Sequence, residues 1–273
     1  MSIAGSIDKA VDRAVELGCG TFQIFTKNPR GWKFSDLKKE DAKNFRDKLA
    51  SSKLVSPLDH MPYLPNLSTP EEEIYKKSVD IFTEELKRSA ALGIPYLVTH
   101  VGSHKGKGIA HGIKRITEAC NTALKSADNS VIILLEITAG TKNSVGSTFE
   151  HLKQIMNGVR PNNRVGMCFD TCHAFAAGYD LRSKEAVART ISLLDDIIGL
   201  ERVKAVHAND SKGPLGSGLD RHEHIGMGYI GEKGFRELFS HNHFSNLPKV
   251  LETPIDDRRD DIGNIRKLKQ ICS

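Results

Sequence analysis

Short apolar runs alternate with longer amphipathic segments along the whole chain, and this alternation limits the fold more than any other feature. The apolar runs lie at residues 21–25, 55–60, 96–100, 131–136, 165–170, 203–210 and 249–254. Near-continuous apolar character is typical of parallel strands that helices cover. Helices are predicted between these strands, at residues 7–17, 36–51, 70–92, 109–126, 147–156, 183–198, 232–239 and 258–270.

The order of strand and helix predicts an α/β protein with the (β/α)8 architecture of a TIM barrel. The chain opens on a helix directly after "MSIAGS", so the first barrel strand is expected to be truncated or missing. No linker rich in Pro, Ser or Gly divides the chain, and residues 1–273 are predicted to form one domain. A doubly wound open sheet is the alternative, but its Gly-rich phosphate turn after an early strand is not present.

Composition restricts the setting in which the protein works. The chain is 39% hydrophobic and 27% charged, which suits a globular protein, and no apolar run reaches the roughly 18 residues of a membrane span. The start "MSIAGSIDKA" does not resemble a secretory signal, and five Cys are too few and odd in number for a disulfide framework. A cytoplasmic location is expected, with association to the nucleoid if the source is prokaryotic. The net charge of +5 suits a polyanionic partner, although many enzymes that never contact DNA share it.

Imidazoles and carboxylates stand at the carboxyl ends of six successive predicted strands, or in the loops that follow. They are His60, His100, Glu136, Asp170, His173, His207, Asp220, His222 and Glu252. A TIM barrel assembles its active site at this end, and buried carboxylates must be paired or bound to cations. His with carboxylate suits zinc, manganese or iron, and nine ligands exceed the three that a catalytic zinc usually takes. The pattern therefore predicts two or three metals, with Glu136 as the bridging ligand.

Each of these residues also has a simpler interpretation. A single His at a strand end is more often a hydrogen-bonding partner than a ligand. Asp170 could cap the following turn, and Glu252 could pair with Arg or Lys, so only the complete set favours metal binding. Cys168 and Cys172 could suggest a thiolate zinc site, but no second Cys pair completes one, and both are predicted to be core residues.

Long, ordered stretches of the chain resemble the endonuclease IV family of apurinic/apyrimidinic endonucleases. They are "FTKNPRGW", "HMPYLPNL", "HVGSH", "LEITAG", "VGMCFDTCHAFAAGYD", "HANDSKGPLGSGLDRHEHIGMGYIG" and "LETP". The resemblance implies a monomeric TIM barrel that hydrolyses the phosphodiester 5′ to abasic sites in damaged duplex DNA, leaving a 3′-hydroxyl and a 5′-deoxyribose phosphate, and that trims blocked 3′ ends. It also implies three zinc ions per chain, with manganese as an alternative at one or more positions. Ile137 stands where the family usually has Asn.

The resemblance assigns the nine residues to three metals. The first metal takes His60, His100 and Glu136, the second takes Glu136, Asp170, His207 and Glu252, and the third takes His173, Asp220 and His222. Metals lower the pKa of bound water and so supply a hydroxide as the attacking group. Glu136, which bridges the first two metals, is expected to be catalytic and to orient this hydroxide.

Residues in the early loops are expected to contact DNA. Arg30, Tyr63 and Leu64 are predicted DNA-binding wedges at the abasic gap, where unstacking costs least, although Tyr63 could instead be a packing residue. Phosphate contacts are expected from Lys27, Lys105, Lys107, Lys212 and Arg221.

Two other functions fit parts of the pattern. A metal-dependent sugar isomerase or epimerase of the same barrel type is the stronger alternative, but it rarely needs nine ligands, and the third metal set disfavours it. A catalytically silent DNA- or metal-binding protein would show substituted ligands, and all nine are present.

Overall fold

The computed structural model describes residues 1–272. Its internal contacts divide the chain into two compact units. The first unit comprises Met1–Leu135 and Ile155–Gly166, and the second comprises Glu136–Gln154 and the chain from Met167 onward. The single domain expected over residues 1–273 stays a prediction. Among the helices described, none combines the length and the apolar character that a membrane crossing requires.

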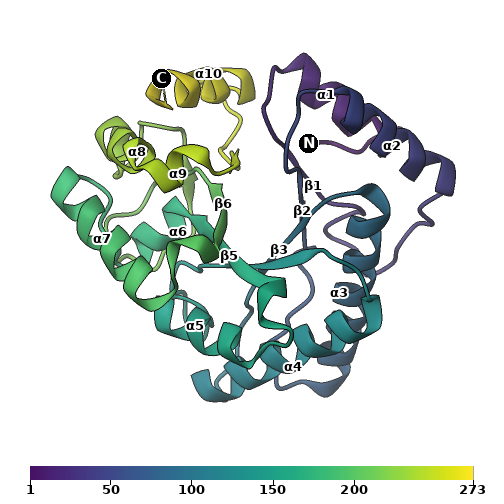
Figure 1. The fold of residues 1–273 in the computed structure, drawn as a ribbon. Coiled ribbons are helices and arrows are strands. Elements are labelled where there is room, and N and C mark those ends of the chain that lie inside the picture. The colour runs from purple at the N-terminus through teal and green to yellow at the C-terminus, as the bar shows by residue number, and fades with distance from the viewer. Residues whose placement is uncertain (273) are drawn as a thin grey trace. The chain divides into compact units, whose positions relative to one another are not determined.

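The first unit alternates helices and strands, as the sequence predicts (Figure 1). Its elements are α1 (Lys9–Glu16), β1 (Gln23–Ile24), α2 (Lys39–Ser51), β2 (Leu58–His60), α3 (Glu72–Leu92), β3 (Tyr96–His100), α4 (Ile109–Ala127) and β4 (Ile132–Glu136), whose last residue begins the second unit. The strands β1, β2 and β3 are parallel neighbours, with Ile24 opposite Asp59 and His60 opposite Val98. The first two strands are shorter than the runs 21–25 and 55–60 that predict them.

Apolar faces hold the first unit together. α1 packs against α2, and α3 packs against α4. Phe22, just before β1, and Phe45 of α2 belong to the same apolar cluster as the buried face of α1, with ring centroids 6.1 Å apart and both rings buried. Within residues 1–272 no strand precedes α1, as the truncated first strand predicts, and the amino group of Met1 donates to the carbonyl oxygen of Gln23 in β1.

The second unit continues the alternation and adds a short hairpin. Its elements are α5 (Phe149–Gly158), which crosses into the first unit, β5 (Val165–Asp170), which crosses from it, α6 (Thr171–Ala176), α7 (Lys184–Ile197), β6 (Val203–His207), β7 (Asp210–Ser211), β8 (His222–Glu223), α8 (Gly231–Ser240), α9 (Asn242–Asn246), β9 (Lys249–Val250) and α10 (Asp261–Cys272). β6 pairs in parallel with β5 and with β9, so that Asp170 lies opposite His207 and His207 opposite Val250.

Two predicted strands of this unit are too long, since the run 249–254 forms β9 only over Lys249–Val250, and two short helices were not predicted. The run 203–210 forms β6 only as far as His207, because Asp210 and Ser211 pair antiparallel with Glu223 and His222. The helices α6 and α9 have six and five residues, too short for an apolar periodicity to mark them. The hairpin of β7 and β8 carries Asp220 in its connecting loop and His222 in its second strand, which brings both back toward β6.

Candidate metal centre

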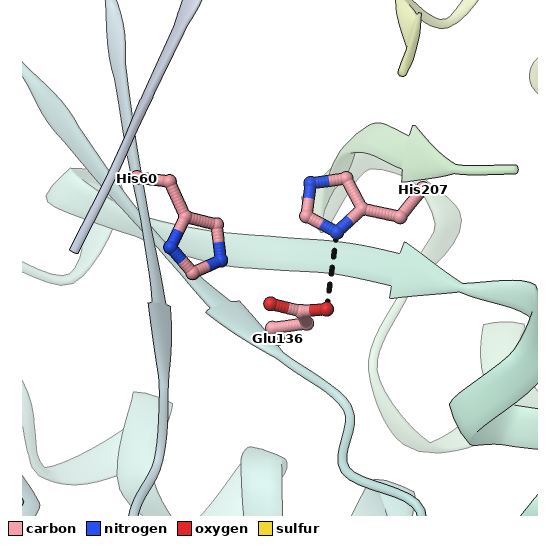
Figure 2. A group of neighbouring side chains, drawn as sticks. All are labelled: His60, Glu136 and His207. Atoms are coloured by element: carbon pink, nitrogen blue, oxygen red, sulfur yellow. Dashed lines mark hydrogen bonds and ion pairs between the residues drawn. The ribbon is translucent and has the colours of Figure 1, made fainter. Parts of the chain in front are cut away.

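Three carboxylates and one imidazole converge at the strand ends of the second unit. Glu136, Asp170, His207 and Glu252 each offer one ligand atom, and these four atoms lie within 4.8 Å of one another. Nδ1 of His207 is 3.0 Å from Oε1 of Glu136 (Figure 2), 3.4 Å from Oε2 of Glu252 and 3.8 Å from Oδ2 of Asp170. All are fully buried except Glu252, whose side chain is 25% exposed. The group thus carries more negative charge than one imidazole can neutralise.

Two further imidazoles of the second unit meet at a shared carboxylate. Nε2 of His173 lies 3.0 Å and Nε2 of His222 lies 3.6 Å from Oδ1 of Asp220. The two Nε2 atoms are only 3.4 Å apart. Nδ1 of His173 lies 3.0 Å from the carbonyl oxygen of Ile137, and Nδ1 of His222 lies 3.0 Å from that of Glu252. A carbonyl oxygen only accepts, so each Nδ1 carries a hydrogen, and each ring turns its Nε2 toward Asp220.

The charge around His173 favours a cation at this position. Burial by itself would lower the pKa of His173, but the negative charges of Asp170, Asp220 and Glu136 raise it well above its ordinary value. Imidazole nitrogens and carboxylate oxygens aimed at one point are also the donors that zinc and similar divalent metals take, so both groups fit a metal ion.

Asp170 owes its position to the junction of β5 and α6. It is the last residue of β5 and caps α6, because its Oδ1 accepts the main-chain N–H of His173 at 2.8 Å. Its Oδ2 accepts the side-chain amide of Asn209 at 2.7 Å, and Oδ1 of Asn209 accepts the main-chain N–H of Glu252 at 2.8 Å. One amide thus holds two of the carboxylates in place. Asn209 is not among the residues predicted from the sequence, where its only signal is its place two residues after His207.

Asp210 is also buried and acidic, but its partners are different. Its carboxylate accepts main-chain N–H groups from Ser211 at 2.8 Å, Gly226 and Gly228 at 3.0 Å, Ile230 at 2.9 Å and Gly231 at 3.2 Å. A Cβ atom on Gly228 would lie 2.4 Å from the carbonyl oxygen of Ser211, so this close approach requires glycine. Asp210 therefore organises the turn after β8, and its lone pairs are occupied by the backbone.

The first unit brings two predicted ligands together. The rings of His60 and His100 lie 5.3 Å apart and nearly perpendicular, at 82°. Nδ1 of His60 lies 2.7 Å from the carbonyl oxygen of Met61, which places the hydrogen on Nδ1 and leaves a lone pair on Nε2. Both rings line a small hollow together with Tyr63 and Thr99.

The predicted DNA-binding residues Arg30, Tyr63 and Leu64 are exposed, Tyr63 by 59% and Leu64 by 40%. The main-chain N–H of Tyr63 donates to the carbonyl oxygen of Pro29 at 3.1 Å, which ties the two segments together.

Among the predicted phosphate contacts, one is wrong. Lys27 is only 3% exposed, and its Nζ donates to the carbonyl oxygen of Gly31 at 2.6 Å, so it cannot reach a phosphate. Lys105, Lys107, Lys212 and Arg221 are exposed, and their predicted role stays a prediction.

Two thiols lie beside the second unit's ligands. Cys168 and Cys172 are buried, which confirms them as core residues, and burial raises their pKa values to about 11 and about 12. A sulfur ligand remains within reach, because Cys172 lies within 4.8 Å of ligand atoms of Asp170 and His222. The protonated thiol instead donates to the carbonyl oxygen of Arg221 at 3.5 Å.

Comparison with known proteins places this arrangement in a class. A family model described as a xylose isomerase-like TIM barrel matches residues 11–270, so the chain is a TIM barrel protein, and it carries candidate metal ligands at its strand ends. The crystal structure of endonuclease IV from Thermus thermophilus matches it with a TM-score of 0.87 and 35% identity, over 99% of this chain and 95% of that one.

The sequence relatives identify the family. A probable endonuclease 4 of Methanoculleus marisnigri is 54% identical over 100% of this chain and 97% of its own length. A probable endonuclease 4 of Nitrosopumilus maritimus is 52% identical over 100% of this chain and 98% of its own. The chain belongs to the endonuclease IV family.

Proposed function

We propose that this protein is a DNA-repair endonuclease that hydrolyses the phosphodiester 5′ to abasic sites in duplex DNA, leaving a 3′-hydroxyl and a 5′-deoxyribose phosphate, and that it also trims blocked 3′ ends. The observation that carries this function is the pair of metal-ligand groups in the second unit, in a chain that is 54% identical to a probable endonuclease 4. We propose that it acts as a monomer.

The cofactor we propose is zinc, three ions per chain, with manganese as an alternative at one or more positions. Support for two of the ions comes from the groups Glu136, Asp170, His207 and Glu252 and His173, Asp220 and His222, whose members lie within 4.8 Å of one another. The third assignment, to His60 and His100 with Glu136, rests on the family resemblance. When bound, such cations lower the pKa of water toward neutrality and offset the negative charge of the phosphodiester.

Glu136 is the residue we propose as catalytic. Its Oε1 is 3.0 Å from Nδ1 of His207 and 3.3 Å from Nδ1 of His173, so it contacts a member of each ligand group of the second unit. A fully buried carboxylate in this position can orient the attacking oxygen and accept its hydrogen bond. Arg30, Tyr63 and Leu64 are proposed to bind the DNA at the abasic gap, where a missing base lowers the cost of unstacking.

The proposal is tested with a duplex that carries a single abasic analogue. The protein as purified, with no magnesium added, should nick the strand 5′ to the lesion. The activity should persist in brief EDTA treatment and disappear as prolonged chelation removes metal. Glu136→Gln should abolish the nick, whereas Glu201→Gln, an exposed acid outside the ligand groups, should not.

The opposite result is equally informative. If metal analysis finds two or three ions per chain and no strand is cut, the endonuclease activity is excluded. Retained activity in Glu136→Gln would remove only the role assigned to that carboxylate.

A further inference from the structure

One turn of α3 presents polar side chains to the interior of the first unit. Glu85, Arg88 and Ser89 are spaced so that they share one helix face, and they are exposed by 0%, 5% and 0%. Burial of a carboxylate and a guanidinium is costly unless each is hydrogen-bonded. Their partners lie in the segment that follows β1 and in β2 itself.

Arg88 joins the two ends of the segment 26–35. Its Nε donates to the hydroxyl oxygen of Thr26 at 2.8 Å, and one terminal nitrogen donates to the carbonyl oxygen of Thr26 at 2.7 Å. The other terminal nitrogen donates to the carbonyl oxygen of Ser35 at 3.0 Å. The hydroxyl of Thr26 in turn donates to Oε2 of Glu85. A planar guanidinium can make these three bonds at once, whereas the point charge of a Lys cannot.

The interior of this segment is closed by a second cation. Nζ of Lys27 donates to the carbonyl oxygen of Gly31 at 2.6 Å and lies 4.5 Å from the centre of the Phe34 ring. The guanidinium of Arg88 lies 5.3 Å from the same ring. The buried cations and Phe34 thus form the inner side of the segment, and Arg30 and Trp32 lie exposed at its outer side.

The same turn of α3 also reaches β2, which leads into the segment 60–64. The hydroxyl of Ser89 donates to Oδ2 of Asp59 at 2.7 Å, one residue before His60. Beyond His60, Tyr63 donates its main-chain N–H to Pro29 at 3.1 Å, and its ring lies 5.2 Å from that of Phe25. Two segments far apart in the sequence are therefore fixed by one helical turn.

We propose that Arg88 and Glu85 are positioning residues that hold the segment 26–35 and, through the bond between Pro29 and Tyr63, join it to the segment 60–64 as one rigid DNA-binding surface. Neither residue touches DNA, because both are buried beneath the segments that would do so. This inference rests on the proposed function. Loss of the hydrogen bonds that the Arg88 guanidinium makes to Thr26 and Ser35 should raise KM for abasic duplex about tenfold, as expected for one charge-assisted hydrogen bond. It should leave kcat within about twofold.

The chain contains a probe of this segment, because its single Trp is Trp32. Acrylamide quenching and anisotropy of Trp32 fluorescence are compared in the full-length holoprotein, in Arg88→Lys and in Arg46→Lys. Arg46 is a matched control, since it also donates to a carbonyl oxygen, that of Ala91, but contacts neither segment through the bonds described. We expect stronger quenching, lower anisotropy and the KM change in Arg88→Lys alone, with the circular dichroism spectrum retained.

If Arg88→Lys does not fold, Thr26→Val removes the hydroxyl between Arg88 and Glu85 at nearly constant shape and should give the same changes. Unaltered quenching and KM in a folded variant, or a fall in kcat at constant KM, would overturn the positioning role. Failure of the wild-type protein to cut abasic DNA would refute the proposed function instead, and the Trp32 measurement would still decide whether Arg88 holds the segment.

Discussion

Both units bury acidic side chains, but the partners of those acids differ. In the first unit, the charges of Arg88 and Lys27 act on the carboxyl group of Glu85, and Ser89 donates to Asp59. In the second unit, Glu136 faces the imidazole of His207, and Asp170 faces imidazole and amide nitrogens. An imidazole can be a cation or a metal ligand but not both, whereas Arg and Lys remain cations. The comparison indicates that the acids Glu85 and Asp59 of the first unit are structural. The acids Glu136 and Asp170 of the second unit are arranged to bind metal.

Asp210 shows a third way to bury a carboxylate. It lies three residues after His207, yet main-chain N–H groups from the turn after β8 surround it. A buried acid near a strand end is therefore not by itself a ligand. The number of acceptor lone pairs that the protein leaves for a cation distinguishes Asp170 from Asp210.

The largest loss of activity is expected when Glu136 of the second unit is replaced. If Glu136 serves metal and substrate, Glu136→Gln should lower kcat/KM on abasic duplex by well over the roughly 100-fold that loss of an outer hydrogen-bond partner costs. Metal removal should have the same effect and should be reversed when zinc is restored. Single-turnover nicking measures both. A variant that keeps full activity would show that the cluster is structural, like that of the first unit.

The next effect concerns the amide that supports two ligands. Asn209→Ala removes the donor to Asp170 and the acceptor for the N–H of Glu252, and should cost about 10–100-fold in zinc affinity or activity. Asn121→Ala is the control, because the Asn121 amide also donates one hydrogen bond and accepts one, with the main chain of Gly158 and Arg160, but in the first unit. Competition with a chromogenic chelator measures the affinity. Equal losses in both variants would mean that Asn209 acts only through stability.

The sequence predicted the parts of the site that depend on strand order. His207 and Asp170 were found because adjacent parallel strands end at the same edge, and they lie opposite each other in the pairing of β5 and β6. Their supporting residues could not be found this way. Asn209 and Arg88 take their roles from partners more than 35 residues distant in the sequence, Asp170 and Thr26 among them.

Lys27 illustrates the error that follows from reading charge alone. A Lys in a loop is usually solvated, and nothing in its neighbourhood along the chain shows that Phe34 and the carbonyl of Gly31 enclose it. The same limit applies to β6, which was predicted to continue to residue 210. The pairing of Asp210 with Glu223 ends it earlier, and this pairing depends on a turn that the residue pattern did not reveal.

A smaller effect is expected where the backbone supplies the partners. Asp210→Asn keeps the shape of the side chain but replaces an acceptor oxygen by an N–H donor facing the N–H groups of the 226–231 turn. The free energy of unfolding should fall by about 2 kcal/mol, the cost of a lost hydrogen bond to a charged group. Chemical denaturation of the zinc-loaded protein measures it. An unchanged stability, with zinc lost instead, would move Asp210 into the ligand set.

The smallest effect is a pH dependence of the free energy of unfolding, which is expected from Glu85 in the first unit. Burial raises the pKa of Glu85 to about 7, against the opposing influence of the Thr26 hydroxyl and the charges of Arg88 and Lys27. Between its ordinary value and that value, the folded protein holds a proton that the unfolded chain has released, so stability falls as pH rises through this window. The side chain of Gln in Glu85→Gln is uncharged at every pH. The free energy of unfolding of this variant should therefore fall by about 1 kcal/mol less than that of the wild type between roughly pH 5.5 and 6.5.

Urea denaturation at each pH measures this difference, and Glu84→Gln, the preceding residue on α3, is the matched control. Parallel pH profiles for the wild type and Glu85→Gln would show that Glu85 is ionised throughout and fully neutralised by Arg88 and Lys27. A difference confined to Glu85→Gln would show that the first unit balances its acids with a proton as well as with fixed cations. The imidazoles of the second unit cannot neutralise acids with a proton while they bind metal, because a protonated Nε2 of His173 or His222 has no lone pair left for the metal.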